Sequence, residues 1–278
     1  MQPKSENVSV AWTGLDVLFF LALWFGAQIA CVGIVFGITA HFSSNTQPQT
    51  AAISAHNEEM AMEQLMDEEE TSGHPVIQLV KYAQQEGSFI AILTAFLAVV
   101  AAAPLIEEFL FRLLCQGWLE AKLSQYQIPS AGGIAVTVVS LFFAMLHMRS
   151  GGVLKGRMLL YLFAGTTVLN LLVFTFGIIY LVWIRNVKMT RCLLGTEPFF
   201  SPHFFANAGC CFLVLLSIFG ISSVLDMFFP NISTEPIPIF FFSLFLGILY
   251  RKTRNLSYCI ILHALLNGTS LTIAWFSV

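Results

Sequence analysis

The chain has 278 residues, of which 57% are hydrophobic and only 10% are charged, and its formal net charge is −3. A soluble domain of this length has roughly a quarter charged residues, because its surface must be solvated. The composition therefore excludes an ordinary soluble fold, and the lack of a basic stretch argues against a nucleic-acid partner. It favours an all-α, polytopic bundle of transmembrane helices in a lipid bilayer.

The first apolar run starts near Val10 and has no clear small-residue cleavage site, so it does not resemble a removable signal peptide. We expect residues 1–41 to form an N-terminal tail and a first transmembrane helix. Residues 42–86 are expected to form an acidic extramembrane loop. The part from 42 to 75 holds seven acidic residues and no Lys or Arg, and such low hydrophobicity favours a solvated or disordered segment.

The rest of the chain, residues 87–278, is dominated by further apolar runs, most of them long enough to cross a hydrocarbon core about 30 Å thick, whereas the run at 237–250 is short unless its helix extends to Arg254. These runs cover residues 87–112, 132–148, 157–184, 206–229, 237–250 and 256–276. Prolines separate the later ones, because a proline inside a helix removes a hydrogen bond and breaks it. The sequence thus predicts about seven spans.

The distribution of Lys and Arg predicts the orientation of these spans. A cytoplasmic N-terminus places nine Lys and Arg residues on the inner side and four on the outer side, together with the acidic loop. This is the bias that the positive-inside rule describes. We therefore expect a multi-pass protein with a cytoplasmic N-terminus. We also expect its membrane to be the bacterial inner (plasma) membrane.

One expected span carries two carboxylates and an arginine, although a charge inside a span costs about 2.5–3.5 kcal/mol. Glu108 and Arg112 are four residues apart on one helix face, which predicts an ion pair that supports the bundle. Glu107 is rotated by about 100° from Glu108 and needs another partner. An unpaired carboxylate in a bilayer binds a proton more readily than one in water. This greater basicity suits a general base, which must accept a proton near neutral pH.

Two later spans add imidazole and amide groups. His147 ends an apolar helix, where an interface residue or a helix cap is the alternative interpretation. His263 and Asn267 are four residues apart and share one face of the last span, where an interhelical hydrogen-bond pair is the alternative. With Glu107 they supply a base, a second proton carrier or ligand, and donors for a developing oxyanion. A hydrolase that uses water as nucleophile requires these parts.

The expected depths of these residues agree only in part. His263 lies about 10–12 Å past Arg254 and Glu107 about 7–8 Å from Arg112, at 1.5 Å per residue. A span that begins at Gly132 carries His147 about 22 Å away from the inner face. The three positions agree only if residues 113–127 run along the interface or the helices tilt strongly.

Three short motifs resemble those of one family of membrane enzymes, the CAAX-protease and bacteriocin-processing family of intramembrane proteases. The motifs are Glu107-Glu108-x-x-x-Arg112, Phe143-x-x-x-His147 and His263-x-x-x-Asn267. Residues 249–257 are also similar to the family's Tyr-Arg-x-Thr-x-Ser-Leu stretch, with Asn-Leu-Ser in place of Ser-Leu. The resemblance covers about residues 88–150 and 237–276.

The resemblance implies an intramembrane endopeptidase that hydrolyses peptide bonds of membrane-associated or lipidated proteins. It implies that Glu107 and His147 activate water, and that His263 and Asn267 stabilise the oxyanion. The remaining motif residues would support these four: Glu108, Arg112 and Phe143.

A metal cofactor is one alternative within this resemblance, with zinc held by Glu107, His147 and His263, and a metal-free glutamate mechanism also fits. Family members commonly have about one span between the second and third motifs, whereas residues 157–229 add a probable insertion of two. The rival interpretation is a non-catalytic scaffold or bacteriocin-immunity-type protein that uses the polar cluster for packing. A transporter that relays protons is a third.

Overall fold

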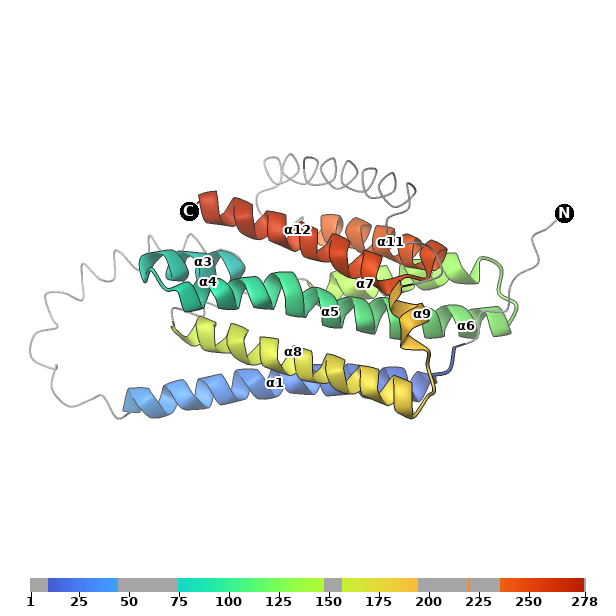
Figure 1. Cartoon of the computed structure of the whole chain (residues 1–278), viewed down its shortest axis with the longest axis horizontal. Helices are drawn as coiled ribbons and strands as arrows, with labels where there is room; N and C mark the ends of the chain where they lie inside the picture. Colours follow the sequence, from blue (N-terminus) through green and yellow to red (C-terminus); the bar gives the residue numbers. More distant parts are fainter. Residues whose placement is uncertain (1–9, 45–74, 148–156, 195–219, 221–235, 278) are drawn as a thin grey trace, which may run out of the picture. The chain divides into compact units, whose positions relative to one another are not determined.

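Figure 1 shows the computed structural model of the chain, which describes residues 10–44, 75–147, 157–194, 220 and 236–277. Helices are the only regular secondary structure within these ranges. Four helical stretches are long and apolar enough to cross a membrane: Gly14–Ile38, Phe89–Gln125, Met158–Trp183 and Leu256–Phe276. The all-α membrane bundle predicted from composition is therefore confirmed for the described part of the chain.

The helices can be compared with the apolar runs that the sequence predicts to span the membrane. The expected run at 206–229 lies outside the described residues, and each other run falls on a helix. The two shorter ones fall on α7 (Ala131–Leu146) and α11 (Pro236–Thr253). The total of seven spans stays a prediction.

The chain divides into two compact units, which we describe one at a time. Unit 1 comprises residues 1–23, 103–149 and 171–265, and unit 2 comprises residues 24–102, 150–170 and 266–278.

A continuous helical run of 37 residues, Phe89–Gln125, contains both glutamates of the first motif. Its segments are α4 (Phe89–Phe96), the π-helical η1 (Leu97–Ala102), α5 (Ala103–Glu108), the π-helical η2 (Phe109–Gln116) and α6 (Gly117–Gln125). Pro104 explains the wider turn of η1, because a residue without a backbone N–H cannot continue the α-helical ladder. Wide turns of this kind occur often at functional sites.

This run corrects the expected end of the second span, because the helix does not stop at Arg112. It continues through η2 and α6, so residues 113–125 extend the same helix that carries Glu107. Gln127 and Ser130 then take positive φ values of 55° and 60°, and the chain reverses into α7.

The two legs of this hairpin bring His147 back to the level of Glu107. From Glu107 to Gln125 the helix rises about 27 Å, and from Ala131 to His147 it rises about 24 Å. Because α7 packs along α6 and η2, the two rises nearly cancel. The longer helix therefore accounts for the shared level of Glu107 and His147. The depth conflict came from taking Arg112 as the end of the span.

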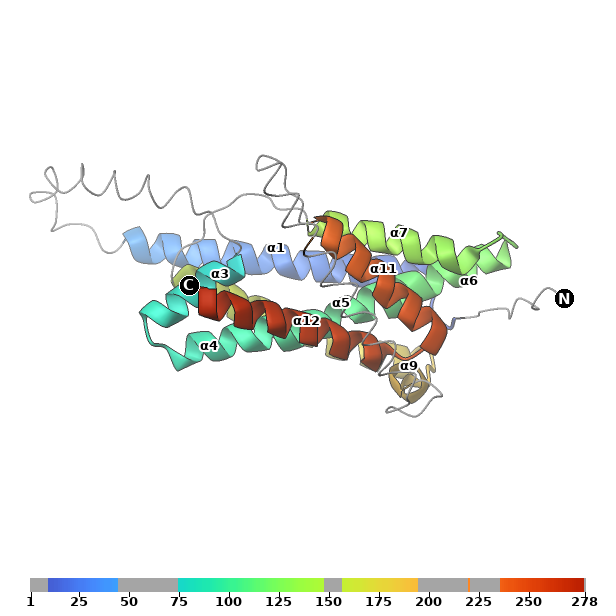
Figure 2. The same cartoon turned by 90° about the horizontal axis from the view of Figure 1, so that it is seen from above.

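The core of unit 1 is completed by α11 and by parts of α1 (Gly14–Ser44), α8 (Arg157–Trp183) and α12 (Leu256–Ser277). Figure 2 shows α11 beside α7, and a Cβ on Gly247 would lie only 2.8 Å from Val136 Cγ1. Phe20 of α1 packs edge-on against Phe109, with ring centroids 6.0 Å apart. A short helix, α9 (Met189–Leu194), accepts a hydrogen bond at the Leu194 carbonyl from Asn255.

Unit 2 contains an amphipathic helix, α3 (Pro75–Gln85), within the stretch predicted as loop. Its apolar residues Leu79, Val80 and Ala83 are buried, and α3 packs against α4. The Gln84 side chain donates to the Trp275 carbonyl at 2.8 Å and so ties α3 to the end of α12. Residues 75–85 of the predicted 42–86 loop are thus helical, and residues 45–74 lie outside the described part.

Candidate active site

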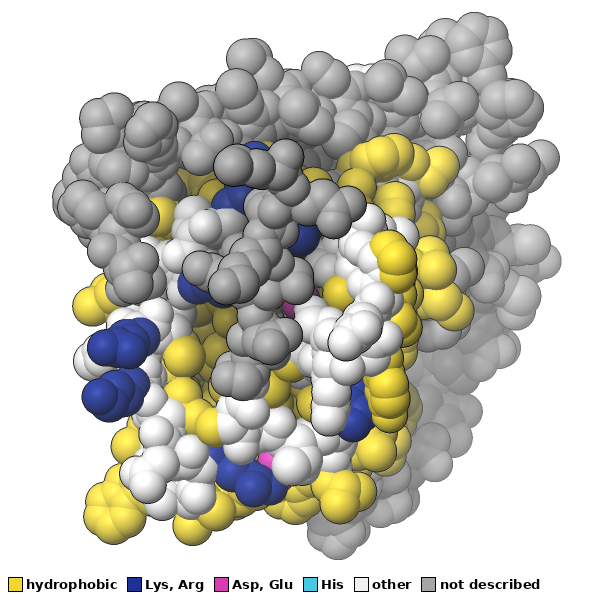
Figure 3. Space-filling model, turned by 90° about the vertical axis from the view of Figure 1, so that its right-hand side faces the viewer, with side chains coloured by type: hydrophobic (Ala, Val, Ile, Leu, Met, Phe, Trp, Pro, Cys, Tyr) yellow, Lys and Arg dark blue, Asp and Glu magenta, His cyan; other side chains and the backbone are white. Residues whose placement is uncertain are grey.

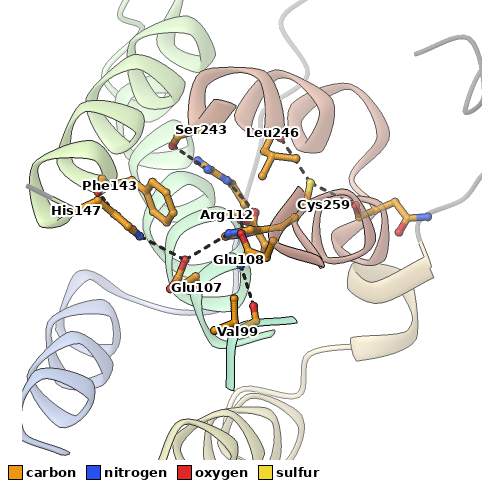
Figure 4. Close-up of polar contacts among 12 residues, drawn as sticks. Val99, Glu107, Glu108, Arg112, Phe143, His147, Ser243, Leu246 and Cys259 are labelled. Atoms are coloured by element: carbon orange, nitrogen blue, oxygen red, sulfur yellow. Dashed lines mark hydrogen bonds and ion pairs between the residues drawn. The ribbon is translucent and has the colours of Figure 1, made fainter. Parts of the chain in front are cut away.

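In unit 1, Glu107 faces the imidazole of His147 (Figure 4) and also lies near that of His263. Its Oε2 atom is 3.9 Å from His147 Nε2 and 3.7 Å from His263 Nε2. The Glu107 side chain is 14% exposed, and the side chains of His147 and His263 are 35% and 6% exposed. Both distances are too long for a direct hydrogen bond and suit a bridging water.

The His263 ring is oriented by the second glutamate. Its Nδ1 atom lies 2.8 Å from Glu108 Oε1, and the Glu108 side chain is fully buried. A carboxylate can only accept, so Nδ1 carries the hydrogen and Nε2 faces Glu107. Phe242 packs edge-on against the imidazole, with centroids 5.2 Å apart, and further restricts the ring.

The His147 ring is held by the residue one turn before it. Its Nδ1 atom lies 2.8 Å from the Phe143 carbonyl oxygen, which can only accept. The Phe143 ring also stacks on the imidazole at a centroid distance of 4.3 Å and a tilt of 36°. A helix terminus would let the ring rotate freely, but these two contacts direct Nε2 of His147 toward Glu107.

Arg112 pairs with Glu108, as the spacing predicts, at 3.0 Å between Nε and Oε2. Both side chains are fully buried. The guanidinium also donates to Ser243 Oγ of α11 at 2.8 Å and lies 5.6 Å from the centroid of the Phe143 ring. This ion pair therefore joins three helices. It connects the continuous helix of α5 and η2 to α11 through Ser243, and to α12 through the hydrogen bond between Glu108 and His263.

The formal charges of the cluster show how many protons it must bind to be neutral. Glu107 and Glu108 bring two negative charges, and Arg112 brings one positive charge. An uncompensated charge is costly in a low-dielectric interior, so the neutral state of the cluster holds one additional proton. The groups that can hold it near Glu107 are the carboxylate itself and the two Nε2 atoms. A cluster of this composition can bind a water molecule and move one proton.

Asn267 lies one helical turn beyond His263 on α12 and belongs to unit 2. Its amide nitrogen donates to the Val99 carbonyl at 2.8 Å. That carbonyl is five residues before Pro104, which has no N–H to offer it in a π-helical turn. The bond uses one amide hydrogen and leaves the other for a further partner. The oxyanion role of Asn267 stays a prediction.

The prediction from sequence did not include one polar residue of this cluster, Ser243. The signal was present, because Ser243 follows three phenylalanines in an apolar run, where a hydroxyl needs a partner. Nothing in the sequence, however, connects it to Arg112, 131 residues earlier.

The zinc alternative, with Glu107, His147 and His263 as ligands, can be compared with the spacing of these residues. Tetrahedral zinc with bonds of 2.0–2.2 Å to nitrogen and oxygen places its ligand atoms about 3.3–3.5 Å apart. The distances from Glu107 Oε2 to the two Nε2 atoms are 3.7 and 3.9 Å. Among the residues that the structure describes, no group of three or more His, Cys, Asp or Glu is arranged as a metal site. The two distances from Glu107 are longer than tetrahedral zinc requires, and we derive no step through a metal.

Together, the fold and the cluster define a helical integral membrane protein with buried carboxylates and imidazoles that face one another. A family model described as "Type II CAAX prenyl endopeptidase Rce1-like" matches residues 89–188 and 195–269, which is more than half of the chain. The chain belongs to this Rce1-like family, which confirms the family resemblance of the three motifs. No curated protein and no solved structure gives a significant match.

Family membership places the chain in a group of membrane proteases. The matched region includes all three motifs, from Glu107 to Asn267. It also includes α8, one of the spans that the sequence interpretation treats as an insertion.

Proposed function

We propose that the chain is an intramembrane endopeptidase that hydrolyses a peptide bond of a membrane-associated or lipidated protein. One observation carries the proposal: Nε2 of His147 and Nε2 of His263 both face the same Glu107 oxygen, within 4 Å. Polar residues that serve only to pack helices together do not need two imidazole rings whose Nδ1 atoms are each held by a hydrogen bond so that both Nε2 atoms face one carboxylate. The Rce1-like family supports the peptidase class, and its name suggests the lipidated substrate.

In this proposal a water molecule occupies the space between Glu107 and the two imidazoles. The water loses one proton to Glu107, and His147 is the alternative acceptor for that proton. At the same time the water oxygen bonds to the scissile carbonyl carbon. The carbonyl oxygen becomes an oxyanion, which protonated His263 and the free amide hydrogen of Asn267 stabilise. The C–N bond then breaks, and the proton held by Glu107 passes to the leaving nitrogen.

The depth of the cluster also supports a substrate bond cleaved inside the bilayer. His263 lies about 10 Å along α12 from the helix start at Leu256, at 1.5 Å per residue. The basic residues Arg251, Lys252 and Arg254 come just before that start. The site is therefore below the level at which basic side chains are solvated, and a substrate must present its peptide bond at the same depth.

The direct test compares proteolysis by the full-length protein and by two matched variants in proteoliposomes. Glu107→Gln removes the base, and Glu86→Gln makes the same change at an exposed residue. New protein N-termini in a membrane-protein extract are identified by mass spectrometry. We expect the same cleavages with the wild type and Glu86→Gln, and none with a folded Glu107→Gln. Equal cleavage by all three, or by none, would favour the scaffold interpretation.

A further inference from the structure

We infer that one end of unit 1 binds the headgroups of anionic phospholipids. The described ends of several helices meet there, and their Lys and Arg side chains gather on one face, which Figure 3 views directly. The residues of this basic surface come from the end of α6, from the segment between α8 and α9 with α9 itself, and from the turn between α11 and α12. They are Lys122, Arg185, Lys188, Arg191, Arg251, Lys252 and Arg254.

Ion pairs and hydrogen bonds within unit 1 join these helix ends. Glu120 of α6 pairs with Arg254 at 3.0 Å and with Arg251 at 3.4 Å, which joins α6 to the turn between α11 and α12. The Asn255 side chain of that turn donates to the Leu194 carbonyl at 2.7 Å, which joins α9 to it. The surface is therefore one contiguous feature of unit 1.

A further pair of contacts adds the beginning of α1 and the end of α8. Arg185 binds Asp16 at 2.6 Å, and Tyr180 donates a hydrogen bond to the same carboxylate. Trp12, just before α1, donates through its indole nitrogen to the Leu114 carbonyl at 3.1 Å. This bond connects the beginning of α1 to the helix that continues into α6.

The charge of the surface is left largely uncompensated by the described residues. Its acidic side chains, Asp16 and Glu120, are 5% and 4% exposed and are committed to the ion pairs above. Glu120 is shared by two arginines, so the surface keeps a clear positive excess. Lys188, Arg191 and Lys252 are exposed. Phosphodiester groups are the anions that such an excess would meet at a membrane surface.

Exposed aromatic side chains at the same end point to lipid rather than to a soluble anion. Trp183 ends α8 and is 80% exposed, and Tyr126 follows α6 and is 66% exposed. Trp and Tyr are enriched where hydrocarbon meets the headgroups, because each has an apolar ring and a polar atom. Basic groups at the same end as exposed Trp and Tyr are typical of a surface in the headgroup layer, with phosphates as its ligands.

The test titrates the full-length protein in neutral micelles with dibrominated phosphatidylglycerol or dibrominated phosphatidylcholine. Bromine quenches nearby tryptophan, and Trp183 reports on this surface. The triple variant Lys188→Gln, Arg191→Gln, Lys252→Gln removes exposed charges, and Lys81→Gln in α3 of unit 2 is the matched control. We expect the wild type and the control to prefer phosphatidylglycerol. The triple variant should bind it on the order of 100-fold more weakly, from about fivefold per basic side chain.

Any one of three binding results would overturn the inference. They are equal affinity of the wild type for the two lipids, an unchanged affinity in the triple variant, and competition by inorganic phosphate at the concentration of the lipid. If the triple variant does not fold, the wild type decides alone. Raising the salt from about 0.01 to 1 M shortens the screening length from about 30 to 3 Å, so the preference must fall. A preference independent of salt would also overturn the inference.

Discussion

The ion pair between Glu108 and Arg112 gives a prediction whose size follows from the structure. Arg112→Met keeps an unbranched side chain of similar length but removes the 3.0 Å contact with Glu108 and the 2.8 Å bond to Ser243. Because Glu108 and Arg112 are fully buried, the mutation leaves a carboxylate with His263 as its remaining partner. Breaking one side of a buried pair lowers the free energy of unfolding by about 3–5 kcal/mol.

A double-mutant cycle separates this pair from general damage to the helix. Glu108→Gln should also destabilise strongly, because it strands the guanidinium. The double variant should lose less than the two single losses added together, with a coupling free energy of about 0.5–3 kcal/mol. The measurement is SDS-induced unfolding in mixed micelles, followed by tryptophan fluorescence. Strictly additive losses, or a stable Arg112→Met protein, would refute the proposed support role.

The other predictions concern packing, the Arg112 contact and metal dependence. Gly247→Ala should lower the free energy of unfolding by about 1–3 kcal/mol, because the new Cβ would meet Val136, whereas Gly133→Ala has open space and should not destabilise. Ser243→Ala should cost about 1.5–3 kcal/mol in the same assay, since it removes a buried bond to a charged group. Metal chelation by 1,10-phenanthroline should leave the cleavage rate unchanged, and loss of cleavage that zinc restores would contradict the metal-free scheme.

Much of the fold could be predicted because lipid imposes simple rules. Apolar runs of span length follow directly from composition, and they locate the described long helices. The predicted end of the second span, at Arg112, was wrong because the charge of Arg112 was assumed to lie at the membrane interface. Its partners, Glu108 four residues before it and Ser243 131 residues after it, let it be fully buried instead. Periodicity predicts the first partner but not the second.

The candidate site shows the same division between local and long-range information. The rotation between adjacent glutamates predicted that Glu107 and Glu108 face different partners, and this holds for His147, which lies near Glu107, and for Arg112, which pairs with Glu108. The sequence did not reveal that His263 contacts both, with Nδ1 on one carboxylate and Nε2 near the other. Such bridging depends on the packing of α12 against α5, which no local pattern specifies.

The most direct test of one shared site is whether Glu107 and His147 act as a unit. The cleavage rate of a membrane substrate is measured for Glu107→Gln, His147→Ala and the double variant, each shown to be folded. Each single change should slow the reaction by about 10²–10⁴-fold, and the double variant should be about as slow as the slower single variant. Losses that multiply, or full activity in Glu107→Gln, would contradict the account.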